Sequence, residues 1–186
     1  MSRGCRNAFI LAMVAAAAMN LVSGCGYSNR SSFLDEFHSI AVTPMRNEID
    51  FTRETAQYKK LDLYYPLVES KLSSSLNDEF LFDGKLKLAE QGTADLVLEG
   101  GVIKFSRDGL RYSKDGSNVE EYRLSVCVRL RLKDNRKGNV LWEEPNFCGE
   151  TSYFITGKET ETEDNALSRC LADLSRRVVE RVVDTW

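Results

Sequence analysis

Apolar and polar residues alternate most regularly between Tyr122 and Leu132, where every second side chain is apolar. Successive side chains of a strand point to opposite faces, so this pattern predicts a strand with one dry and one solvated face, as in antiparallel sheets. Val140–Ile155 follows a glycine-containing turn and predicts the partner strand. Pro145 within it indicates a bulge or an edge position, because proline cannot donate to a strand ladder.

Shorter apolar stretches predict the other strands. Residues 39–44 hold strand-forming side chains and end at a proline, and residues 94–106 form a longer apolar run. Residues 85–88 alternate in polarity and predict a short edge strand. Residues 46–60 and 108–118 are polar and predict loops.

The strand over residues 94–106 is expected to contain one bulge, because its apolar residues change parity along it. Leu96 and Leu98 share one face, whereas Ile103 and Phe105 have the opposite parity. A bulge at the glycine pair between them, residues 100–101, would bring both pairs to the core.

Two stretches have the period of an amphipathic helix. The first begins at Tyr65-Pro66, where proline suits the first helical position, and stops at Gly84. The second begins at Asn165 and continues to the C-terminal region. The order β-α-β-β-β-α predicts an α+β fold, a two-layer sandwich with two helices packed on one face of a mainly antiparallel four-stranded sheet. The apolar stripes of the helices are Val68, Leu72, Leu76 and Phe80, and Leu167, Cys170, Leu171, Leu174, Val178 and Val182.

The N-terminal residues have the pattern of a bacterial lipoprotein signal peptide (1–24). Two arginines precede an apolar run that is shorter than the ~20 residues of a spanning helix, and the small residues Ser23-Gly24 stand before Cys25. Cleavage there would leave Cys25 as the acylated N-terminus of a tether (25–37), followed by one folded domain (38–186). The alternative is an ordinary secretory cleavage site with an incidental cysteine. Gly26 resembles Gram-negative lipoproteins of the outer membrane, since an aspartate at that position usually retains them at the inner one.

The charge balance excludes one class of partner. Removing residues 1–24 removes two of the 25 Lys+Arg and none of the 28 Asp+Glu, which leaves a formal charge of −5. Nucleic-acid affinity comes mainly from cationic neutralisation of phosphates, so an acidic chain of this kind predicts no nucleic-acid partner.

The sequence has no recognisable catalytic or metal motif. His38 is the only histidine and stands in a polar setting, and no glycine-rich phosphate loop follows a strand. The cysteines are isolated, whereas zinc sites use close ligand pairs. We therefore predict a protein that is not an enzyme, with no metal and no cofactor apart from the covalent lipid on Cys25.

The cysteines after the lipidation site predict one disulfide. With the turn near residues 136–138, Cys127 and Cys148 come opposite each other or nearly so in the hairpin, on its solvated face, and a single bulge near Pro145 would align them. The alternative is two unpaired thiols on neighbouring strands. Cys170 belongs to a helix stripe and is expected to be a buried free thiol.

A set of basic residues repeats on the solvated face of the sheet. Guanidinium groups bind phosphate and carboxylate in bidentate fashion, so this face could hold an anionic amphiphile. The alternative is a solubilising face whose charge is partly neutralised by nearby glutamates. The candidate anion-binding residues are Lys104, Arg123, Arg129 and Arg131.

Several phrases in this order resemble the LptE family of lipopolysaccharide-assembly lipoproteins. They include the start Cys-Gly-Tyr at Cys25, the AVTP strand at 41–44, ADLVLEG at 94–100, VEEYRLSV at 119–126 and VLWEE at 140–144. The resemblance also covers the Tyr-Pro-led helix and the last helix. It implies two helices against a four-stranded sheet, and an outer-membrane lipoprotein, anchored on the periplasmic side, that plugs the lumen of the LptD β-barrel. It further implies delivery of lipopolysaccharide to the cell surface, which makes lipopolysaccharide the expected ligand of the basic face.

Two other functions remain open from the sequence. One is a lipid-anchored scaffold or pilotin-like lipoprotein of another envelope machine, and the other is a periplasmic enzyme without recognisable motifs. Depletion separates the first from lipopolysaccharide assembly, because only the latter should leave lipopolysaccharide short of the surface.

Overall fold

The computed structural model describes residues 36–50 and 65–183, all within the second of the chain's two units, Ser31–Trp186. The predicted signal peptide (1–24), Cys25 and most of the predicted tether (25–37) lie outside the described residues. In chain order the elements are β1 (Ser39–Val42), β2 (Arg46–Asn47), α3 (Val68–Asp83), β3 (Lys87–Leu88), β4 (Leu96–Tyr112), β5 (Val119–Asp134), β6 (Val140–Phe154) and α4 (Glu163–Val183).

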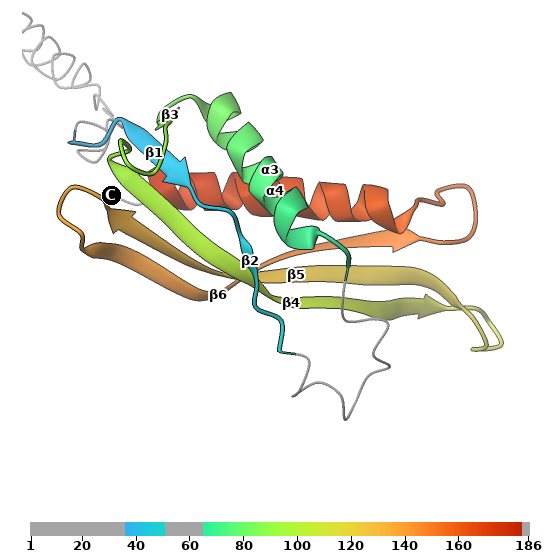
Figure 1. Ribbon diagram of the computed structural model, residues 1–186. Coiled ribbons are helices and arrows are strands. Elements are labelled where there is room, and N and C mark those ends of the chain that lie inside the picture. The colour runs from blue at the N-terminus through green and yellow to red at the C-terminus, as the bar shows by residue number, and fades with distance from the viewer. Residues whose placement is uncertain (1–35, 51–64, 184–186) are drawn as a thin grey trace, which may run out of the picture. The chain divides into compact units, whose positions relative to one another are not determined.

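The strands form one mixed sheet of order β3-β1-β4-β5-β6, with β2 paired to β4 (Figure 1). β1 runs parallel to β3 and β4, β2 also runs parallel to β4, and β4, β5 and β6 form an antiparallel meander. The α+β class with two helices is confirmed, but the prediction of four strands is wrong, and one edge of the sheet is parallel. α3 lies between β1 and β4, and a helical crossover joins parallel strands. β3 lies within residues 85–88, where the alternation predicted a short edge strand, whereas the two residues of β2 are too few to display a period of two.

Both helices cover the same face of the sheet (Figure 1). α3 buries its predicted stripe of Val68, Leu72, Leu76 and Phe80, and its end is closed by Gly84 at φ 68°. Removing a large aliphatic or aromatic side chain from water stabilises the fold by about 1.5–3 kcal/mol, so this layer is the main source of stability. The corresponding buried residues of α4 include Leu167, Cys170, Leu171, Leu174, Val178 and Val182.

The alternation along β5 places its apolar residues under the helices. Residues that pair directly across neighbouring strands lie on the same face of the sheet. We call the face without helices the open face. The covered side of β5 carries Leu124, Val126, Val128, Leu130 and Leu132. The open face carries Glu99, Lys104, Ser106, Arg123, Ser125, Cys127, Arg129, Arg131, Lys133, Glu143, Cys148 and Glu150.

The first register shift along β4 lies at Ile103 and not at the predicted glycine pair. The register shifts between Val102 and Lys104, so Val102 and Phe105 both enter the core and Ile103 is half-buried. Gly100 and Gly101 have another role. A Cβ on Gly100 would lie 2.4 Å from a carbonyl oxygen of β5, and one on Gly101 would lie 2.7 Å from the side chain of Glu48. These glycines therefore allow the close approach of β5 and of the segment after β2.

Several boundaries also differ from the predictions. α3 begins at Val68, so Pro66 is not its first helical residue, and α4 begins at Glu163 instead of Asn165. β4 continues to Tyr112, so the predicted loop over 108–118 shortens to residues 113–118. The segment predicted as a loop over 46–60 begins with β2, and its residues 51–60 are outside the described part. Pro145 stands at a register shift in the edge strand β6, as predicted.

Candidate functional site on the open face of the sheet

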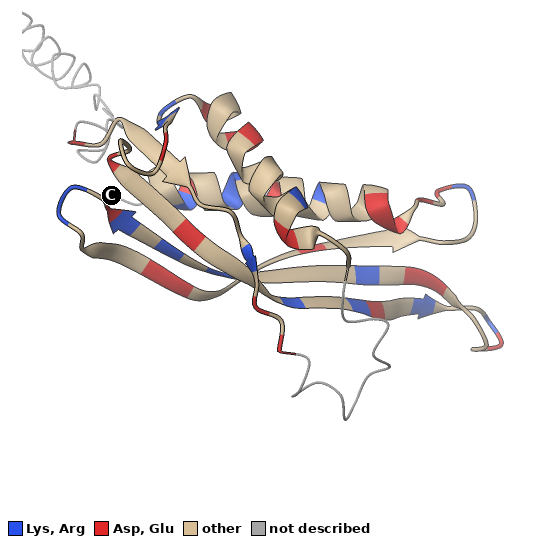
Figure 2. Ribbon diagram, in the orientation of Figure 1, with Lys and Arg blue, Asp and Glu red and all other residues tan. Residues whose placement is uncertain are grey.

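The four predicted anion-binding residues lie on the open face. Lys104 pairs across the ladder with Cys127, and Arg131 pairs with Glu99 on one side and Glu143 on the other. Figure 2 shows basic and acidic positions interleaved along β4, β5 and β6. The open face is therefore a mixed charged surface and not a purely cationic one.

Each of the three arginines has a carboxylate partner. Arg129 forms the pair with the most hydrogen bonds, with Nη2 at 2.6 Å and Nε at 3.1 Å from Oε2 of Glu48. Arg131 Nε lies 2.5 Å from Glu143, whereas Arg123 Nε is 4.0 Å from Glu150. The hydrogen bonds and charge of Glu48 raise the pKa of Arg129 above its usual value. Lys104 is exposed and has no carboxylate within 4.0 Å among the described residues.

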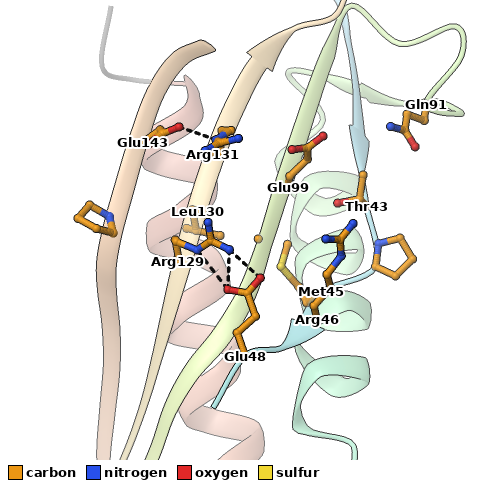
Figure 3. A pocket seen from close by; sticks show the side chains of 13 residues that line it. Thr43, Met45, Arg46, Glu48, Gln91, Glu99, Arg129, Leu130, Arg131 and Glu143 are labelled. Atoms are coloured by element: carbon orange, nitrogen blue, oxygen red, sulfur yellow. Dashed lines mark hydrogen bonds and ion pairs between the residues drawn. The ribbon is translucent and has the colours of Figure 1, made fainter. Parts of the chain in front are cut away.

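A groove of about 550 Å³ crosses the open face between β2 and β6 (Figure 3). Arg46 and Glu48 border it on one side, and Arg129 and Arg131 come from β5. The backbone N–H of Glu48 donates to the carbonyl of Val102 at 2.8 Å, which holds this segment against β4. The lining residues are Thr43, Pro44, Met45, Arg46, Glu48, Gln91, Glu99, Gly100, Arg129, Leu130, Arg131, Glu143 and Pro145.

The groove is lined by equal numbers of positive and negative side chains, and a ligand could replace one partner of an ion pair. Three arginines and three glutamates line it, and the described part of the chain contains no ion pair for the exposed Arg46. Ion pairs this exposed contribute only about 0.2–1 kcal/mol, so a ligand oxygen could replace a glutamate at small cost. A guanidinium released in this way would bind a phosphate with two parallel hydrogen bonds.

Arg46 and Glu48 were absent from the predicted set. Both fall in a stretch with no period, and Glu48 is 81 positions from its partner Arg129. Only the parallel pairing of β2 with β4 brings them to the face. A polar stretch between two predicted elements carries no signal of such a contact.

The structure joins Cys127 and Cys148 by a disulfide across β5 and β6, with the two sulfurs 2.11 Å apart. Cys170 is a buried free thiol on α4, and burial raises its pKa to about 11. It lies against Gly149, where a Cβ would be 2.9 Å from Leu174. The bond thus stands on the open face beside Lys104, while the free thiol belongs to the covered core.

Other chemistry is not evident in residues 36–50 and 65–183. His38 is exposed, and no group of three or more histidine, cysteine, aspartate or glutamate side chains within these ranges could hold a metal ion. None of the helices in the same ranges has the length and apolar character needed to cross a membrane.

Comparison with known proteins gives related folds and one family. No curated protein matches the chain. A candidate lipoprotein from Caulobacter crescentus has a TM-score of 0.50 at 14% identity, covering 83% of this chain and 95% of the other. Protein XCC0632 from Xanthomonas campestris has a TM-score of 0.53 at 14% identity, covering 80% and 84%. At this identity the likeness extends to the fold alone.

The family assignment comes from sequence. The LptE family, described as lipopolysaccharide-assembly, matches residues 37–184, which span both helices and every described strand. The predicted resemblance is confirmed over the whole folded domain. On this ground the chain belongs to the LptE family of lipopolysaccharide-assembly lipoproteins, a family without enzymatic activity.

Proposed function

We propose that this chain is an acylated outer-membrane lipoprotein that assists delivery of lipopolysaccharide to the cell surface, as the partner and plug of an LptD β-barrel. The family match over residues 37–184 is the observation that carries the proposal. The sequence supports the anchor, because Leu-Val-Ser-Gly precedes Cys25 and Gly26 follows it.

The open face supports the place of this domain in a barrel. The lumen of a large outer-membrane barrel is polar and wet. Helices cover one face of this sheet, and most charges on the other face are in half-exposed ion pairs. That face can therefore lie against such a wall with few unpaired charges buried. Arg131–Glu143 and Lys133–Glu99, with the second pair at 2.6 Å, are examples.

The groove supports contact with a phosphorylated glycolipid. Phosphate oxygens of lipopolysaccharide would replace Glu48 at Arg129 and use Arg46 as a second cation. Lys104, Arg123 and Arg131 would extend the contact along the sheet. The exposed Pro44 and Pro145 give the groove an apolar surface for the uncharged part of the ligand.

Depletion tests the proposal against its rival. If the chain serves lipopolysaccharide transport, its depletion leaves newly made lipopolysaccharide short of the cell surface, as measured by surface labelling of the glycolipid. Complementation with the intact chain restores labelling, and complementation with Cys25→Ser does not. Normal surface lipopolysaccharide after complete depletion would contradict the proposal and favour a lipid-anchored scaffold of another envelope machine.

A further inference from the structure

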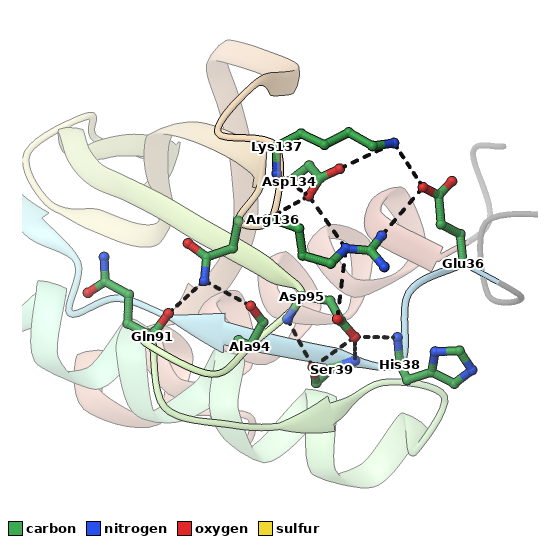
Figure 4. A network of polar contacts seen from close by, with 10 residues as sticks. Glu36, His38, Ser39, Gln91, Ala94, Asp95, Asp134, Arg136 and Lys137 are labelled. Atoms are coloured by element: carbon green, nitrogen blue, oxygen red, sulfur yellow. Dashed lines mark hydrogen bonds and ion pairs between the residues drawn. The ribbon is translucent and has the colours of Figure 1, made fainter.

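The two edges of the sheet differ in what they offer to a further strand. On one side the sheet ends in β3, which has only two residues, and the start of β1 is already hydrogen-bonded within the chain (Figure 4). Oδ2 of Asp95 accepts the backbone N–H groups of His38 at 3.0 Å and Ser39 at 3.1 Å. The carbonyl of His38 accepts the N–H of Lys87 at 2.9 Å. On the other side β6 has 15 residues, so its outer edge is the longer template for strand pairing.

The second half of β6 has a regular row of outward backbone groups. In an antiparallel pair, every second residue directs its N–H and C=O groups towards the neighbouring strand. The N–H of Ile155 donates to the carbonyl of Glu120 at 3.0 Å, so the odd-numbered residues of this half face β5. The register with β5 runs through this half without a shift. The residues whose backbone groups point outward are therefore Cys148, Glu150, Ser152 and Phe154.

Two arginines of α4 occupy outward carbonyl groups of β6. Nη1 of Arg177 donates to the carbonyl of Cys148 at 2.8 Å, and Nη2 of Arg169 donates to the carbonyl of Ser152 at 3.0 Å. The two arginines are eight residues apart, about 12 Å along a helix, and the two carbonyls are four residues apart, about 13 Å along a strand. Because these spacings match, one helix can bind both carbonyls at once.

Further contacts hold both guanidinium groups at the edge. Arg177 lies over the ring of Phe147 at 4.8 Å, and Arg169 pairs with Glu161 at 2.6 Å. The backbone N–H of Glu161 itself donates to the carbonyl of Phe154 at 2.9 Å. Three of the four outward carbonyls of this half are therefore already bonded within the chain.

The first half of β6 is less suited to strand pairing. Pro145 has no N–H and stands at a register shift, so it interrupts the row of backbone donors. Arg181 continues the arginine row here, with Nε 3.2 Å from Glu144 and its guanidinium 5.1 Å from the ring of Trp142. A further strand would therefore pair with the second half, from Cys148 to Phe154.

We propose that the outer edge of β6 from Cys148 to Phe154 is a surface through which two copies of this chain can pair, and that Arg169 and Arg177 keep it closed in the single chain. Every copy carries the same edge, and two identical edges pair antiparallel in one symmetric interface. A second copy is therefore the partner that fits a released edge. The inference requires neither the anchor nor the barrel of the proposed function, although a lumen that holds one copy agrees with a closed edge.

Co-purification from cells that make the full chain with two different epitope tags tests the inference. One tag is used for purification in mild detergent, and the other is quantified in the eluate. Arg169→Ala/Arg177→Ala on both copies should recover about tenfold more of the second tag than the wild type, because two carbonyls become available to a second strand. Arg176→Ala is the matched control, since Arg176 pairs with Asp173 and Glu180 of its own helix, and it should leave recovery unchanged.

A second change locates the surface. Within the described residues the N–H of Glu150 makes no hydrogen bond, so Glu150→Pro removes a donor from the edge without breaking the ladder to β5. Added to the double variant, it should return recovery of the second tag to the wild-type level. Circular dichroism shows whether each variant is folded. Arg177→Ala alone leaves Arg169 in place and should raise recovery about threefold, which tests the same point if the double variant does not fold.

Four results would overturn the inference. One is a folded double variant that recovers no more of the second tag than the wild type. An equal rise for Arg176→Ala would show that association follows charge alone, and a rise that Glu150→Pro does not reverse would place the contact elsewhere. Recovery of a different protein in place of the second tag would exclude a second copy as the partner. Lipopolysaccharide transport is measured separately, so each of these results leaves the proposed function standing.

Discussion

The two faces of this sheet come from the same strands, but one is packed with apolar side chains and the other carries charged ones. On the covered face, residues of β5 such as Leu124 and Val128 are fully buried under α3 and α4, and a change of one methylene alters packing. On the open face, the intervening residues of β5 include three arginines, and each of them meets a carboxylate from β6 or from the segment after β2. Packing on the covered face supplies most of the stability of the domain. The charges of the open face can exchange partners with little loss of free energy. A protein of this kind can therefore change its binding surface without changing its fold.

The largest expected effect is on the covered face. Leu76 is fully buried in the α3 stripe, and Leu76→Ala should lower the free energy of unfolding by about 2–5 kcal/mol, from lost burial and the cavity left behind. Denaturant unfolding followed by circular dichroism measures it. Ser74→Ala, at an exposed position of the same helix, is the control. A loss below about 1 kcal/mol would mean that α3 is not part of the stabilising layer.

The disulfide is the one covalent contribution of the open face to stability. Cys127 and Cys148 are 21 residues apart, and closing a loop of this length stabilises a domain by about 3 kcal/mol through the unfolded state. The double variant Cys127→Ser/Cys148→Ser should lose about that amount in denaturant unfolding. The wild type in reductant should match it. Equal thiol counts in denatured protein before and after reduction would contradict the bond.

A smaller effect is expected from a polar group on the covered face. Burial raises the pKa of Tyr153 to about 12, with Glu163 adding to the shift as its carboxylate accepts the phenol at 3.0 Å. The ordinary tyrosine pKa is about 10, so the unfolded chain releases this proton first and stability falls as pH rises from 10 towards 12. Tyr153→Phe should flatten this fall in unfolding measured as a function of pH. An identical slope in wild type and variant would place Tyr153 in a solvated setting.

The smallest effects on stability belong to the ion pairs of the open face, where binding should change instead. Arg129→Met should alter the free energy of unfolding by less than about 1 kcal/mol and weaken lipopolysaccharide binding by about tenfold. Glu48→Gln should strengthen binding a few-fold, because it removes the carboxylate that competes with phosphate for Arg129. Titration with purified lipopolysaccharide measures both.

A matched variant on α4 controls for charge alone. Like Arg129, Arg176 is ion-paired, in its case with Asp173 and Glu180. It lies on the exposed side of α4. Arg176→Met should leave lipopolysaccharide binding unchanged. Equal losses for Arg129→Met and Arg176→Met would show that binding follows net charge, and the distinction between the faces would fail.

The covered face could be predicted from the sequence because its signal is local. Periods of two in β5 and of four in α3 identify the buried positions without knowledge of the partner strands. The alignment of Cys127 with Cys148 depends on one turn and on two register shifts in the same hairpin. The edge strand β3 was predicted from its alternation, but its parallel pairing with β1 has no local signal, and β2 is too short for a period. The groove was missed for the same reason: Glu48 meets Arg129 through a pairing that is remote in sequence.

The most direct test of the whole account is affinity purification of the acylated chain from outer membranes in mild detergent. The account predicts that a large β-barrel protein co-purifies with it in a stable complex that also contains lipopolysaccharide. Recovery of the intact, acylated chain without any barrel partner would contradict the account.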